Sequence, residues 1–114
     1  MPRSEARVAT DRSARYAKQL AAHMGRKIEA DWSEETGRGT LTFGRGTATL
    51  EAAPDALLLT VEGETENLPG LEDVVGRHLV RFGARDELVV SWQRDNGEPG
   101  LVQRNAEPAE PAEG

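Results

Sequence analysis

The sequence predicts an α+β fold, a two-layer sandwich in which two helices cover one face of an antiparallel sheet in the order β-α-β-β-β-β-α-β. Three observations lead to it. An apolar stripe at helical spacing runs through 68–82, an alternating strand follows at 87–93, and four short alternating segments lie within 27–63. Each element is apolar mainly on one side, so all of them need a common core.

The chain begins with a predicted strand and a predicted helix. Residues 4–10 (SEARVAT) alternate weakly between apolar and polar, as a strand does. Thr10 or Asp11 then caps a helix that runs to about Met24. The spacing gives this helix the inward positions Ala14, Tyr16 or Ala17, Leu20, Ala21 and Met24.

Four strands joined by short turns come next, and they predict an antiparallel meander with one polar face. The predicted strands are KIEADWS (27–33), TLTF (40–43), TATLEA (47–52) and ALLLTVEG (56–63). Gly37-Arg38-Gly39 and Gly44-Arg45-Gly46 fall between strands and not before a helix. We therefore interpret them as hairpin turns and not as phosphate-binding loops.

The second helix is predicted over 68–82, with Pro69 in its first turn and Gly83 just past its end. Its apolar stripe contains Leu68, Leu71, Val74, Val75, Leu79 and Phe82. The positions expected to lie mostly away from that stripe are Glu72, Asp73, Gly76, Arg77 and Arg81. In the strand that follows, the residues expected to face the core are Leu88, Val90 and Trp92.

The composition changes after this strand. Residues 95–114 are rich in Gly, Pro and Glu and contain an AEP-AEP-AEG repeat. This predicts one α+β domain at 1–94 and a disordered acidic tail at 95–114.

Overall composition limits the classes of function. The chain has 114 residues, no cysteine and a net charge of −6. Disulfides and cysteine chemistry are excluded, and an acidic protein of this kind is not expected to bind nucleic acid. No apolar run is long enough to span a membrane, and the polar N-terminus does not resemble a signal peptide. We therefore expect a cytoplasmic protein without a membrane partner.

Two resemblances add to this interpretation. The element order resembles the TATA-binding-protein-like topology, with no DNA function implied. Several segments resemble the bacterial domain of unknown function family 2218, over roughly residues 4–93: SEARVAT, RYAKQLAAH, GRGTLTFGRGTATLEA and LEDVVGRHLVRFGARDELVVSW. The resemblance implies no established activity. It implies that His23 and His78 recur in the family, and that genes of its members lie in iron or siderophore uptake gene neighbourhoods.

The candidate site consists of His23, His78, Arg77 and Arg81. His78 borders the stripe of the second helix and His23 lies in the last turn of the first, so side-by-side helices would bring the two imidazoles together. With the arginines they would hold a small anionic ligand. The alternative is structural: His78 bonded to a carbonyl, and His23 acting as a cation at a helix C-terminus.

No metal site, cofactor or catalytic group is predicted. The two histidines lack an i, i+4 partner, and the nearest acids are not at ligand spacing. We expect a non-enzymatic small-ligand-binding or accessory protein, with the iron link resting on the resemblance. Two alternatives stay open: a small enzyme with His78 as acid–base and Arg81 holding an anion, and a homodimer formed through a sheet edge or the basic first helix.

Overall fold

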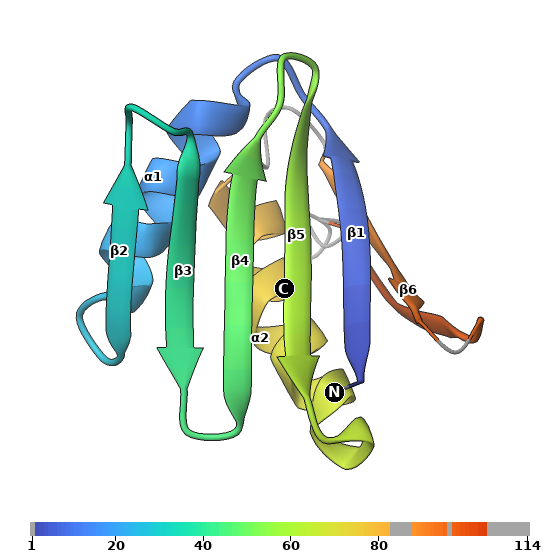
Figure 1. Ribbon diagram of the computed structural model, residues 1–114. Coiled ribbons are helices and arrows are strands. Elements are labelled where there is room, and N and C mark those ends of the chain that lie inside the picture. Colours follow the sequence, from blue (N-terminus) through green and yellow to red (C-terminus); the bar gives the residue numbers. More distant parts are fainter. Residues whose placement is uncertain (1, 83–87, 96, 105–114) are drawn as a thin grey trace, which may run out of the picture.

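The computed structural model describes residues 2–82, 88–95 and 97–104. Within these ranges the protein is α+β, with two α-helices and seven strands in one antiparallel sheet of order β2-β3-β4-β5-β1-β6-β7 (Figure 1). The elements are β1 Arg3–Ala9, α1 Ser13–Met24, β2 Glu29–Ser33, β3 Arg38–Phe43, β4 Gly46–Ala52, β5 Ala56–Gly63, the 3₁₀ turn η1 Thr65–Asn67, α2 Leu68–Phe82, β6 Val89–Arg94 and β7 Pro99–Arg104.

The predicted meander is present as consecutive hairpins from β2 to β5. Gly37, with a φ of 70°, lies in the β2–β3 connection, and Gly44 and Arg45 lie in the β3–β4 connection, as predicted. Arg38, Gly39 and Gly46, which were predicted to be turn residues, belong to the strands. The first strand then enters the middle of the sheet, where β1 pairs with β5 on one side and with β6 on the other. The first strand therefore lies between β5 and β6, and β6 and β7, from the later part of the sequence, complete that side of the sheet.

The core lies between the sheet and the helices. Figure 1 shows α1 and α2 behind the sheet, against the same face. The first helix packs on β2 to β5, and the second packs on β1 and on β4 to β7. The predicted α2 stripe meets the sheet in one buried cluster that contains Leu57, Trp92, Leu71 and Leu79, with Phe43 packed against it. The comparison with TATA-binding-protein-like topology stays a prediction.

Positions on both helices differ from the prediction. Ala14 is exposed, whereas Ser13 is buried and donates a 2.6 Å hydrogen bond from its Oγ to the Ala53 carbonyl. That bond fixes the start of α1 against the β4–β5 turn. On α2, Glu72 and Gly76 are buried although they lie off the apolar stripe. They face β7, a strand that the hydrophobic pattern does not reveal.

The expectation that the chain is disordered from residue 95 onward is wrong for Pro99–Arg104. This segment forms β7, antiparallel to β6, with an irregularity in register between Ser91 and Gln93. A proline is tolerated on a strand at the edge of a sheet, because its missing N–H is not needed there. Gly83 and residues 105–114 lie outside the described residues. No helix in the described ranges is long and apolar enough to cross a membrane.

Candidate functional site

The structure brings the two predicted histidines together. The ring centroids of His23 and His78 are 5.0 Å apart, with the ring planes tilted by 43°. His23 is exposed at the end of α1, and its ring centroid also lies 5.4 Å from that of Phe82 in a T-shaped arrangement. His78 is half-buried, and its Nδ1 lies 2.6 Å from the carbonyl oxygen of Val74. The juxtaposition follows from α1 packing beside α2.

Positive charge surrounds this pair. Partial burial lowers the pKa of His23 from its ordinary value, and the imidazole of His78 lowers it further. The cations Arg26, Lys27 and Arg81 act in the same direction. Desolvation and several like charges therefore both oppose protonation of the His23 ring.

The two predicted arginines border a different feature, a groove between α2 and β7. Arg77 and Arg81 line it from α2, and Val102 and Arg104 line it from β7. Its volume is ≈ 570 Å³, and its remaining lining residues are Asp73, Val80 and Gln103. Neither histidine is among the lining residues, so the four predicted site residues divide between an imidazole pair and an arginine-lined groove.

A buried ion pair, which the sequence pattern did not indicate, joins α2 to β6, and the same carboxylate also binds the backbone of β7. Glu72 has a fully buried side chain and accepts hydrogen bonds from Arg94 Nε at 3.0 Å and Arg94 Nη2 at 3.1 Å. It also accepts the backbone N–H of Leu101 at 3.1 Å. Burial alone would raise the pKa of Glu72, but the hydrogen bonds from Arg94, Ser4 and Leu101 outweigh it and lower the pKa.

Gln103 extends this network to the core. Its Oε1 accepts the indole N–H of Trp92 at 2.9 Å, and its Nε2 donates to the Glu72 carbonyl at 3.1 Å. The amide lies against Gly76, where a Cβ would come within 2.2 Å of Gln103 Oε1. Gly76 and Gly100 are the sequence signals for this contact, since a glycine within an element often marks a close approach by another chain segment.

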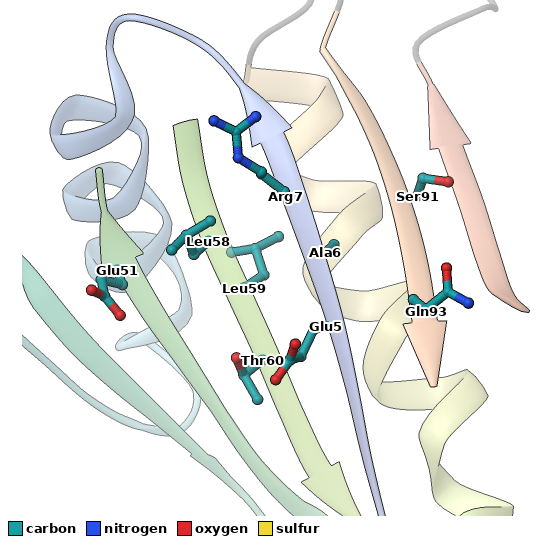
Figure 2. Close-up of a pocket in the computed structure, with 9 residues that line it drawn as sticks. All are labelled: Glu5, Ala6, Arg7, Glu51, Leu58, Leu59, Thr60, Ser91 and Gln93. Carbon is teal, nitrogen blue, oxygen red and sulfur yellow. The ribbon is translucent and has the colours of Figure 1, made fainter. Parts of the chain in front are cut away.

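A second hollow lies on the face of the sheet opposite the helices. Figure 2 shows it lined from β1 by Glu5 and Arg7, from β5 by Leu58 and Thr60, and from β6 by Ser91 and Gln93. The polar character of this face agrees with the predicted alternation. Acidic and basic side chains are interspersed here, so the hollow offers no consistent charge to a ligand, and it is a weaker candidate than the arginine-lined groove.

No cluster of three or more His, Asp or Glu side chains that would hold a metal ion occurs in the part of the chain that the structure describes.

Over its described residues this is a small α+β protein in which two helices cover one face of an antiparallel sheet. The chain belongs to the bacterial domain of unknown function family 2218, described as an uncharacterized protein conserved in bacteria, whose family model matches residues 5–93. Among solved structures it is similar to the NMR structure of PA4090 from Pseudomonas aeruginosa. The two share 33% sequence identity with a TM-score of 0.68, over 82% of this chain and 96% of that one. Nothing among curated proteins matches the sequence.

Proposed function

We propose that this protein is a non-catalytic binding or accessory protein that holds a small organic anion in the groove between α2 and β7. The observation that carries the proposal is the balance of charge around the groove. Three guanidinium groups, those of Arg77, Arg81 and Arg104, line it together with one carboxylate, that of Asp73. Such an excess of positive charge attracts an anion from solution.

A ligand would easily displace Asp73 from Arg77. Arg77 Nε lies 3.4 Å from Asp73 Oδ2, and both side chains are about half exposed. An exposed i, i+4 pair of this kind is worth only a few tenths of a kcal/mol. Arg81 and Arg104 form no salt bridge within residues 2–82, 88–95 and 97–104. A ligand carboxylate or phosphate would gain forked guanidinium contacts at little cost.

The apolar lining residues of the groove favour an anion with an apolar part. Val80 and Val102 are among its lining residues, and Val102 is 54% exposed although it is a large apolar side chain. A volume of ≈ 570 Å³ lies in the range of small-molecule sites. The class of ligand is therefore a small carboxylate or phosphate ester with a short hydrocarbon portion.

The link to iron or siderophore handling rests on the family resemblance alone. Siderophores that carry free carboxylates fall within the proposed ligand class, so they belong in the panel of compounds to be tested. His23 and His78 lie outside the groove, and for that reason we do not assign them a direct contact with this anion.

The test is a binding screen of short-chain carboxylates, phosphate monoesters and carboxylate siderophores. Binding is measured by thermal shift and by amide chemical shifts in two-dimensional NMR. A ligand that binds the folded state must raise the melting temperature. We expect amide shifts on α2 and β7, lost in Arg81→Gln and Arg104→Gln. Arg12→Gln is the matched control, because Arg12 is exposed at the start of α1. Binding that both groove variants retain would refute the assignment.

A further inference from the structure

The imidazole pair offers a second kind of site, distinct from the arginine-lined groove. His23 and His78 come from different helices, and their ring centroids are 5.0 Å apart. Their side chains meet near the surface, since His23 is exposed and His78 half-buried. Sequence spacing reveals histidine pairs within one helix, such as i, i+4, but it does not reveal a pair that two packed helices create.

The hydrogen bond of His78 fixes which of its ring nitrogens is available. A carbonyl oxygen only accepts, so the Nδ1 that lies 2.6 Å from the Val74 oxygen carries the proton. In the neutral ring the lone pair is then on Nε2. Histidines that bind metals commonly donate their second N–H to a carbonyl or carboxylate in this way, which holds the ring in place for the ion.

The separation of the rings matches that of two ligands on one ion. With a metal–nitrogen distance of about 2.0–2.1 Å and about 1.1 Å from nitrogen to ring centre, each centroid lies about 3.1 Å from a bound ion. Two such rings at a tetrahedral angle have centroids about 5.1 Å apart, against the observed 5.0 Å. We propose that His23 and His78 together bind a divalent transition-metal ion of the kind imidazole prefers, such as Zn²⁺.

The surroundings determine how such an ion would be held. Because no larger cluster of metal-ligating side chains occurs in the described part of the chain, water or an added ligand completes the coordination. Arg26, Lys27 and Arg81 lie within electrostatic reach of His23. Their charges repel a dication, and salt screens exposed charges. Affinity for Zn²⁺ therefore rises with ionic strength, the opposite of what a carboxylate site shows.

The test is a Zn²⁺ titration of the full chain without a histidine tag. Binding is measured by calorimetry and by long-range ¹H–¹⁵N spectra of the histidine rings. One ion binds per chain, the Nε2 signal of His78 moves, and its Nδ1 stays protonated. His23→Gln removes one ligand. His78→Asn removes Nε2 but keeps an N–H donor for the Val74 carbonyl. Each substitution weakens binding by about tenfold or more, as loss of a metal ligand should.

Three results overturn the proposal. The first is undiminished Zn²⁺ affinity in the double variant, which would place the ion on carboxylates. The second is ring nitrogen signals that do not move at saturating Zn²⁺, which would make the pair a simple ring contact. The third is affinity that falls with salt. Should His78→Asn fail to fold, the exposed His23→Gln decides alone. Anion binding in the groove is measured separately in His23→Gln and should be unchanged there.

Discussion

Removing the charge of Glu72 should destabilise the protein more than any change on its surface. In Glu72→Gln the shape of the side chain is kept, but an NH₂ group replaces one of the two carboxylate oxygens. Those oxygens now accept from Arg94 and from the backbone N–H of Leu101. The amide leaves at least one of these donors without an acceptor, and it leaves the guanidinium without its counter-charge.

The size of the effect follows from burial. The Glu72 side chain is 0% exposed and the Arg94 side chain 16%. Breaking a buried ion pair by removing one partner costs about 3–5 kcal/mol, because the remaining charge stays desolvated. For a chain of this length that loss lowers the melting temperature by roughly 10–20 °C. The indole–Gln103 bond is weakened as well, because Gln103 is held by the same segment of α2.

The assay is urea unfolding followed by circular dichroism, with hydrogen exchange at the Leu101 amide as the local measurement. Glu51→Gln is the control: Glu51 is exposed on the other face of the sheet, so its loss should stay within about 0.5 kcal/mol. Adding Arg94→Met to Glu72→Gln should cost less than the sum of the two single changes, because the partners interact. A loss below about 1 kcal/mol in Glu72→Gln would refute the role of the Glu72 carboxylate in holding β6 and β7 against α2.

Three further outcomes can be measured on the same protein. Gly100→Ala places a Cβ 2.5 Å from Glu72 Oε2 and 2.7 Å from Trp92 Cβ. This overlap should lower the free energy of unfolding in urea by about 1–3 kcal/mol. Gly44→Ala is its control, because a Cβ there meets nothing within 4 Å. Burial acts to raise the pKa of Glu72, but its hydrogen bonds outweigh burial and the pKa is lowered. The contribution of Glu72 to stability is therefore complete above the ordinary pKa of about 4.3 and is lost as the pH falls below it. The free energy of unfolding should therefore drop on acidification, and more steeply than in Glu72→Gln. The pKa of His23 is lowered, first by partial burial. The unfolded chain therefore takes up a proton at a higher pH than the folded chain does, and stability falls as the pH drops through about 6.5. With a chelator present, urea unfolding at falling pH should show a weaker dependence of stability on pH in His23→Gln, and the same dependence in both proteins would contradict this.

Elements held by apolar side chains were predictable from the sequence. The stripe of α2 predicts a helix over 68–82, and the structure has Leu68–Phe82. Alternation predicts β6 correctly, with Leu88, Val90 and Trp92 buried. In these segments local pattern and tertiary packing agree, because burying apolar surface is the dominant favourable contribution to folding.

The strand β7 was not predictable in this way. Leu101 and Val102 are both exposed, so burial of large apolar side chains does not explain its position. What holds it is polar: the Leu101 amide on the Glu72 carboxylate, and the Gln103 amide between Trp92 and α2. A buried glutamate off the apolar stripe has no signature in hydrophobic periodicity, and the Gly-Pro composition of the segment is typical of a loop.

The candidate site was predictable only in part, for a related reason. The meeting of His23 and His78 needs just one assumption, that the two helices lie side by side, and helical spacing supplies the rest. The arginine-lined groove needs β7, because Val102 and Arg104 form one of its walls. Without that strand, Arg77 and Arg81 look like solvated positions on the polar side of α2.

The fastening of β7 therefore bears on function as well as stability. If the groove binds an anion, Glu72→Gln should weaken that binding although Glu72 does not line the groove, because the wall with Arg104 is released. Zn²⁺ binding at His23 and His78 should be retained, since those residues lie where α1 meets α2. The comparison is made by titration at a temperature where the variant is folded. Loss of both anion binding and Zn²⁺ binding would indicate general unfolding. Retention of both would show that anion binding does not depend on the contact between Glu72 and β7.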